Sequence, residues 1–115
     1  GRLDESLVLK REVFAKFVAL LGATHERTIL TGANLTVSLN QRKLFGETKT
    51  LVRDKLLPAA RRSLGADHDL TLKLNQNLSA ALQLSPEHTR DDLLEAQTIM
   101  QDVIQRRRRV FGPAH

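Results

Sequence analysis

Apolar residues recur along most of this chain at the spacing of an amphipathic helix. In the first 21 residues, Leu3, Leu7, Phe14, Phe17 and Leu21 follow one another at intervals of three, four and seven, with charged residues between them. This spacing predicts a helix over residues 3–20. The same reasoning predicts four more helices, over residues 24–42, 47–63, 68–84 and 89–110. No stretch alternates apolar and polar residues between turn signals, so the expected fold is all-α, with about five helices and no sheet.

Residues with special backbone or capping properties set the expected helix boundaries. Gly22 should end the first helix, and the Thr24 side chain is suited to cap the second. The chain should turn at Gly46, and Asp67 is the expected cap of the fourth helix. Pro58 falls inside the third helix, where it lacks one backbone N–H and crowds the preceding turn. We therefore expect the third helix to kink or break within a turn of Pro58.

Two of the predicted helices carry an apolar face that should point into the core. In the third helix the inward residues are expected to be Leu51, Val52, Leu56 and Ala59, and in the last they are expected to be Leu93, Ala96, Met100, Val103 and Ile104.

A segment of five residues returns along the chain. Residues 21–25 (LGATH) reappear 43 residues later as residues 64–68 (LGADH), and again, degenerate, as residues 111–115 (FGPAH). A fixed period in this range is typical of helical-repeat arrays. We therefore read residues 1–115 as one helical-repeat domain, with a lone helix of a preceding repeat (3–20), two repeats (21–63 and 64–110) and the start of another (111–115).

The repeat unit resembles the tetratricopeptide repeats of kinesin light chain. The resemblance rests on the LGATHERT and LGADHDLT segments and on Asn-Leu-small in the first helix of each repeat, as 34–36 and 77–79. It implies tandem helical hairpins wound into a right-handed superhelix. It also implies that Leu35 and Leu78 pack the core, and that Thr36 and Ser79 lie where two helices approach closely. Leu39 and Leu82 depart from the family pattern, which has tyrosine at that position, and Lys43 replaces the turn glycine.

Composition narrows the class of protein. Apolar residues make up 41% of the chain, no apolar run approaches the length of a membrane span, and the N-terminus does not have the pattern of a signal peptide. With no cysteine there are no disulfides or thiolate metal sites. We expect an intracellular, cytoplasmic protein without a membrane segment.

Candidate metal and catalytic residues are few. His25 and His68 occupy equivalent places in the two repeats, but no cysteine or close carboxylate pair completes a set of three or four ligands. A structural place at the start of each helix is the favoured interpretation. Serines and acids are scattered, without a nucleophile elbow or a phosphate-binding glycine loop. The chain is therefore expected not to be an enzyme and to need no cofactor.

The strongest charge run is Arg106, Arg107, Arg108 and Arg109. Four adjacent arginines can meet phosphate, which gives one alternative function, a nucleic-acid or acidic-surface binder. Successive helical residues are about 100° apart, however, so the four spread around the helix rather than forming one stripe. Aromatic side chains that stack bases are also sparse, so nucleic acid is not the favoured partner. The favoured reading of the run is a solvated basic helix end.

The favoured function is protein–protein interaction. Leu30, Asn34, Val37 and Gln41 form a mixed stripe on the second helix, separate from the apolar stripe of Thr28, Gly32, Leu35 and Leu39. The equivalent residues of the next repeat are Lys73, Asn77, Ala80 and Leu84.

In the resembled family the asparagine before the Leu-small pair faces a peptide groove, which assigns that role to Asn34 and Asn77. We expect a peptide or partner protein on the concave face, touching Asn34, Asn77, Lys73, Gln41, Val37 and Ala80. A structural spacer in a longer solenoid is the other alternative. Because arrays generally need about three repeats for a continuous core, the chain is also expected to be marginally stable or to self-associate through its ends.

Overall fold

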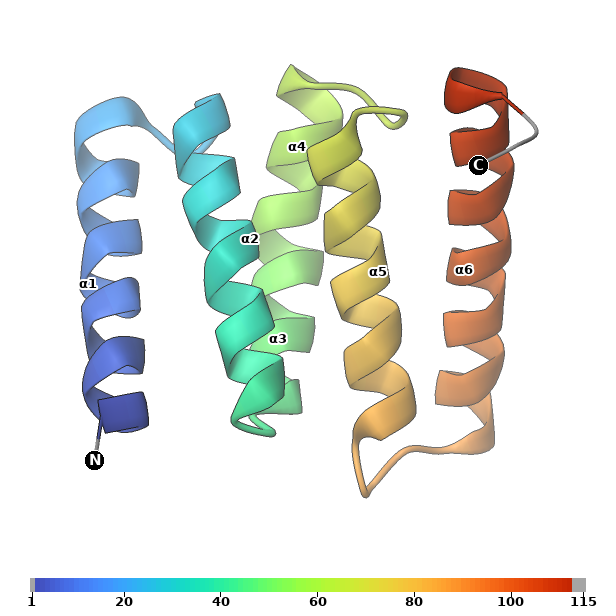
Figure 1. The fold of residues 1–115 in the computed structure, drawn as a ribbon, viewed down its shortest axis with the longest axis horizontal. Helices are drawn as coiled ribbons and strands as arrows, with labels where there is room; N and C mark the ends of the chain where they lie inside the picture. The colour runs from blue at the N-terminus through green and yellow to red at the C-terminus, as the bar shows by residue number, and fades with distance from the viewer. Residues whose placement is uncertain (1, 113–115) are drawn as a thin grey trace.

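The computed structural model describes residues 2–112, with side chains from residue 5 onward, and this part of the chain is helical without a strand (Figure 1). The elements are α1 (Arg2–Leu21), α2 (Glu26–Gln41), α3 (Phe45–Leu51), the π-helical segment η1 (Val52–Leu56), α4 (Leu57–Ser63), α5 (Asp69–Leu84) and α6 (Arg90–Phe111). Since α3, η1 and α4 abut, they act as one helix, and the predicted five helices are confirmed. The side chain of Leu3, a member of the predicted stripe, and residues 113–115 of the predicted further repeat lie outside the described part.

Histidines cap two of the helices. The Nδ1 atom of His25 accepts a hydrogen bond from the Arg27 amide at 3.1 Å, and that of His68 accepts one from the Leu70 amide at 3.1 Å. The expected caps Thr24 and Asp67 are therefore wrong. Each histidine is one residue further along and reaches the first free amides of its own helix, as a cap must.

The turn after α2 forms at Lys43 rather than at the expected Gly46. Lys43 has a φ of +61°, and the Leu44 amide next to it donates to the Leu39 carbonyl at 2.8 Å. This hydrogen bond ends the helix in the way a glycine usually does. Gly46 lies inside α3 instead, because that helix begins at Phe45, two residues earlier than predicted.

The predicted interruption near Pro58 takes the form of a π-helical turn and not of a break. The Leu57 amide donates to the Val52 carbonyl, five residues back, and α4 then starts at Leu57. Pro58 thus falls in the first turn of α4. Because α4 continues directly from η1, Pro58 still removes one backbone donor from this helix. The wider π turn accommodates Pro58 without a loop.

The helix formed by α3, η1 and α4 packs against both α2 and α5, which also pack against each other. The other two helices are at the edges: the backbone of α1 approaches α2 alone, and that of α6 approaches α5 alone (Figure 1). The main core lies between α2, η1, α4 and α5, with Ile29, Val52, Leu56, Leu74 and Leu82 fully or almost fully buried.

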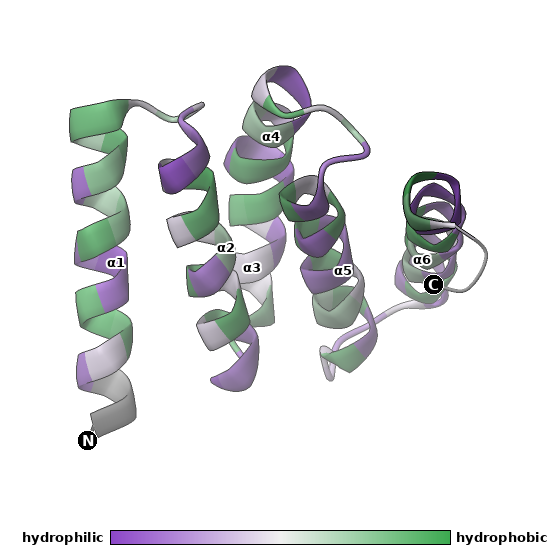
Figure 2. Cartoon of the chain, turned by 45° about the horizontal axis from the view of Figure 1, so that its top comes forward, coloured by the Kyte–Doolittle hydropathy of each residue, from purple (hydrophilic) through white to green (hydrophobic). Residues whose placement is uncertain are grey.

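Burial confirms most of the expected core positions. Thr28, Gly32, Leu35 and Leu39 are buried, as are Leu78 and the two small residues Thr36 and Ser79. Ala96 and Val103 are buried on α6, but Leu93 is 43% exposed and Ile104 is 45% exposed. Their assignment to the core is wrong, because α6 is an edge helix with a single neighbour. Hydrophobic segments are accordingly visible on the outer helices in Figure 2.

None of the described helices combines the length and the apolar character that a membrane span requires.

We expect Gly32→Ala to destabilise the fold by about 1–3 kcal/mol, since overpacking a core usually costs this much. A Cβ at position 32 would collide with the buried Leu56 side chain and press on Phe14. Urea unfolding of the two proteins measures the difference. Gly46→Ala is the matched control, because no atom lies within 4 Å of its added Cβ. The Gly46→Ala substitution should be neutral or stabilising by up to about 1 kcal/mol. An equal loss of unfolding free energy in both variants would contradict close packing at Gly32.

Candidate functional site

The mixed stripes on α2 and α5 lie at the surface of the protein. Leu30, Asn34, Val37 and Gln41 are all exposed on α2. On α5, Lys73 and Leu84 are exposed, while Asn77 and Ala80 are half-buried. Because α2 and α5 pack against each other, the two stripes form one surface, which we call the α2–α5 face. Its apolar residues Leu30, Val37 and Leu84 are 45%, 44% and 63% exposed.

The two asparagines of this face have different surroundings. The Asn77 Nδ2 atom donates to the Thr36 hydroxyl at 2.8 Å, and the Asn40 Nδ2 atom donates to the Asn77 carbonyl at 3.1 Å. Asn77 therefore helps to hold α5 on α2. Asn34 is exposed and has no hydrogen-bond partner elsewhere in residues 5–112. The whole Asn34 amide is therefore available to a ligand, whereas the Asn77 amide has one N–H engaged by Thr36.

The other predicted contact residues surround the two asparagines. Lys73 forms an ion pair with Asp69 at 3.2 Å, one turn earlier on α5, and still projects into solvent. Gln41 lies at the end of α2 beside a small hollow that also involves Lys10 and Ser38. The Lys10 ammonium donates to the Ser38 hydroxyl there, at 2.5 Å. Gln41 is therefore the predicted contact that lies nearest to α1.

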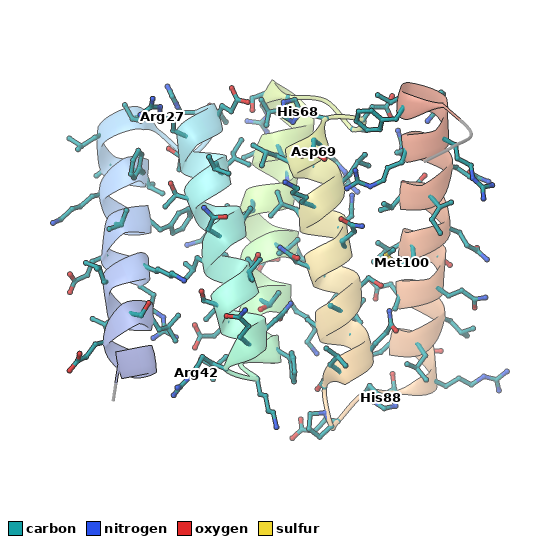
Figure 3. All side chains as sticks on the ribbon, in the orientation of Figure 1. Arg27, Arg42, His68, Asp69, His88 and Met100 are labelled. Atoms are coloured by element: carbon teal, nitrogen blue, oxygen red, sulfur yellow. The ribbon has the colours of Figure 1, made fainter. Side chains whose placement is uncertain are left out.

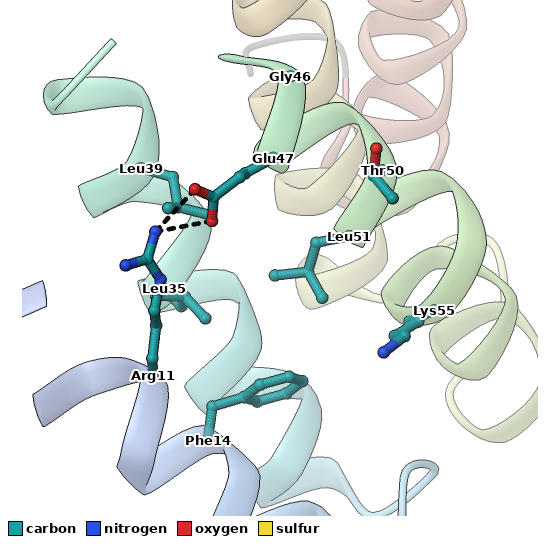
Figure 4. A pocket seen from close by; sticks show the side chains of 9 residues that line it. All are labelled: Arg11, Phe14, Leu35, Leu39, Gly46, Glu47, Thr50, Leu51 and Lys55. Carbon is teal, nitrogen blue, oxygen red and sulfur yellow. Dashed lines mark hydrogen bonds and ion pairs between the residues drawn. The ribbon is translucent and has the colours of Figure 1, made fainter. Parts of the chain in front are cut away.

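A cleft of about 440 Å³ opens on the side of α2 that faces α1 and α3 (Figure 4). Its walls are mostly apolar, with Phe14, Leu35, Leu39 and Leu51 among them. At its rim one Arg11 nitrogen lies 2.7 Å from both Glu47 carboxylate oxygens. The cleft forms because α1 touches α2 but does not close on α3. Sequence reasoning missed it, since periodicity does not report how far apart two helices stand.

The arginine run is anchored rather than free. Arg106 donates to Asp67 at 2.8 Å and to Asp102 at 2.9 Å. Arg107 donates to Asp69 at 3.2 Å and to Gln76 at 3.1 Å, while Arg109 lies 3.5 Å from Asp67.

We call this group the arginine clamp. Asp102 belongs to α6 itself, but Asp67 of the α4–α5 turn and Asp69 of the first turn of α5, the latter labelled in Figure 3, tie the end of α6 to the start of α5. Arg108 is exposed and has no ion pair within the described residues.

The clamp shifts the acidity of its members. The hydrogen bond from Arg106 lowers the pKa of Asp67, with the charge of Arg109 adding to the effect against desolvation. Burial raises the pKa of Asp69, but hydrogen bonds from Lys73 and Arg107 outweigh it, so that this pKa is also lowered. The hydrogen bonds to Asp67 and Asp102 raise the pKa of Arg106. Three of the four arginine charges are thus compensated inside the protein.

The histidines take the structural place expected for them at the helix starts. Besides capping α5, His68 lies with its Nε2 atom 3.5 Å from the Glu26 carboxylate of α2. Within the described chain no three His, Cys, Asp or Glu side chains come close enough together to hold a metal ion.

Comparisons with known proteins add no assignment: no protein-family model matches the chain, and neither does any curated protein or solved structure.

Acid should remove the stabilisation provided by the clamp. Folding lowers the pKa of Asp67 and Asp69, so this stabilisation is fully present above their unfolded pKa of about 4 and is lost as the pH falls through the folded values. Asp67→Asn should therefore lower the free energy of unfolding at neutral pH, with a smaller difference from wild type near pH 2.

Urea titrations at both pH values measure this difference. Asp54→Asn provides the control, since Asp54 is exposed and forms no ion pair with the described residues. A loss for Asp67→Asn that is independent of pH would contradict the clamp.

Proposed function

We propose that this chain is a non-catalytic protein–protein interaction module that binds an extended peptide segment across the α2–α5 face. The observation that carries the proposal is the exposed, unpaired amide of Asn34, which lies between the exposed apolar side chains of Leu30 and Val37 on the same helix face. An asparagine amide can both donate to and accept from a peptide backbone. Apolar side chains beside it can select the side chains of the ligand.

The kinesin light chain-like tetratricopeptide reading is part of this proposal. Three observations support it: the 43-residue period, the pair of histidine caps at equivalent positions, and the burial of both Leu35 and Leu78. In such a right-handed superhelix the α2–α5 face would be concave. We also infer a cytoplasmic location, which suits a chain without cysteine.

The structure distinguishes the expected contacts within this face. Asn34, Val37, Gln41 and Lys73 are exposed and available to a ligand. One N–H of the Asn77 amide is already donated to Thr36, so Asn77 has fewer hydrogen-bonding groups to offer a ligand than Asn34 has. The proposal therefore assigns Asn34 the main backbone contact, with Asn77 and Ala80 forming the border of the surface.

The alternative function as a polyanion binder has weaker support. Arg106, Arg107 and Arg109 each have a carboxylate partner within the protein. Binding phosphate through them would require these ion pairs to be given up, which leaves Arg108 as the available charge of the run. A structural spacer, the other alternative, would have no need for an exposed apolar stripe around Asn34.

Selection from a random peptide library displayed on phage tests the proposal. Enriched peptides should bind the wild-type chain, and Asn34→Ala should weaken them by about 1–3 kcal/mol, roughly five- to 150-fold, as expected for lost hydrogen bonds. Val37→Glu should weaken them as well. Neither substitution should change the melting temperature, because both side chains are exposed.

Thr98→Ala on α6 is the control, since Thr98 is exposed and remote from α2 in the chain. Peptides that bind wild type and Asn34→Ala equally would contradict the assigned face. Binding of a plain DNA duplex that collapses as salt rises, with no peptide enriched, would favour the polyanion alternative.

A further inference from the structure

A second groove lies between α5 and α6, apart from the α2–α5 face. It has a volume of about 410 Å³ and is lined by Gln83 of α5 and by Leu93, Ala96, Met100 and Ile104 of α6, with Gln97 and Gln101 beside them. Leu93 and Ile104 are the residues expected in the core but found exposed. A groove floored by such side chains is a place where another helix can pack.

The preceding repeat shows how an equivalent groove is filled. Phe45, Thr48, Val52 and Leu56 have the same spacing as Leu93, Ala96, Met100 and Ile104, 48 residues earlier. All four are buried, and besides α2, the other helix of the same hairpin, the helix that packs on α3 and η1 is α5. Gln83 occupies the position 43 residues after Asn40, and the Asn40 side chain donates a hydrogen bond to the Asn77 carbonyl of α5. The α5–α6 groove therefore has the shape of a seat for a helix placed as α5 is placed on α2 and α3.

The outer face of α1 has the pattern of a helix that fits such a seat. The face of α5 turned toward α2 and α3 carries Leu70, Leu74, Asn77, Leu78 and Ala81, at intervals i, i+4, i+7, i+8 and i+11. On α1 the residues Leu9, Val13, Lys16, Phe17 and Leu20 have identical intervals, again with the polar residue at i+7. Leu9 is 59% exposed and Leu20 is 82% exposed. We call these five residues the outer α1 face.

We propose that the outer α1 face of one copy of this chain occupies the α5–α6 groove of a second copy. Within its own copy α1 contacts α2 through Leu7 and Phe14, which point roughly away from the outer face at 100° per residue. One α1 helix can therefore contact α2 of its own chain and the groove of a neighbouring copy at the same time. The contact joins two different surfaces, so it is heterologous and builds head-to-tail oligomers.

Polar groups in the groove suit the lysine at i+7. In the α2–α5 contact the i+7 residue, Asn77, meets Thr36 and Asn40. The equivalents in the α5–α6 groove are Ser79 and Gln83. The Gln83 Nε2 atom donates to the Ser79 hydroxyl at 3.0 Å, which leaves the Gln83 amide oxygen as an acceptor. A lysine ammonium has donors only, so Lys16 of the second copy is a matching partner for that oxygen.

Analytical ultracentrifugation of the purified chain over a roughly hundredfold concentration range tests the proposal. The average mass of the wild type should rise with concentration. Leu20→Glu on the outer α1 face and Ile104→Glu in the groove should each weaken association by about tenfold or more, since each places a carboxylate in an apolar contact. Both residues are exposed in the single chain, so helix content by circular dichroism should not change.

Mixing these two variants gives the decisive measurement. The Ile104→Glu chain keeps an intact outer α1 face and the Leu20→Glu chain keeps an intact groove, so an equimolar mixture should form a one-to-one dimer that grows no further. Val8→Glu and Leu94→Glu are matched controls, because both residues are about half exposed on the same helices but outside the two surfaces. They should associate as wild type does.

Three results would overturn the proposal. The first is a wild-type chain that is monomeric throughout the concentration range, and the second is a mixture that contains no dimer. The third is association abolished by Leu20→Glu but unaffected by Ile104→Glu, which would indicate a symmetric contact between two α1 helices.

Discussion

The packing of η1 between α2 and α5 is the contact on which the remaining structure depends. Leu56 reaches α2 at Gly32, where the absence of a side chain lets the two helices come together. Val52 and Leu56 are at the same time covered by α5. These three helices form the only part of the described chain in which each member has two or more neighbours. The positions of α1 and α6 follow, since each rests on one outer helix of this central group.

Local signals in the sequence were sufficient to predict the five helices. Helical periodicity depends on neighbouring residues only, and Gly22 and Pro58 act through their own backbone. The errors at Thr24 and Gly46 are shifts of one to three residues, whereas the role of Asp67 depends on residues far away in the sequence. Asp67 looked like a cap because aspartate is a good one, but its partners Arg106 and Arg109 lie some 40 residues further on. Nothing near Asp67 in the sequence announces them.

The candidate site was also predictable only in part. The exposed stripe on α2 was predictable, because it follows from the same helical periodicity that places Leu35 and Leu39 in the core. The difference between Asn34 and Asn77 was not, although the two residues occupy equivalent repeat positions. It arises because α5 has α2 at its side, whereas Asn34 faces no helix of the described chain. Repeats share a sequence pattern, but each position takes its role from its neighbours.

The histidine caps have a consequence for the imidazole rings themselves. An imidazole exists as two neutral tautomers and one cation, and only the tautomer with its proton on Nε2 can offer Nδ1 as an acceptor to a backbone amide. Of the two neutral tautomers, the starts of α2 and α5 therefore select the one with its proton on Nε2. In His68 the Nε2 atom also lies 3.5 Å from the Glu26 carboxylate. The chemical state of a single ring atom is thus linked to the first turn of a helix and, at α5, to its alignment with α2.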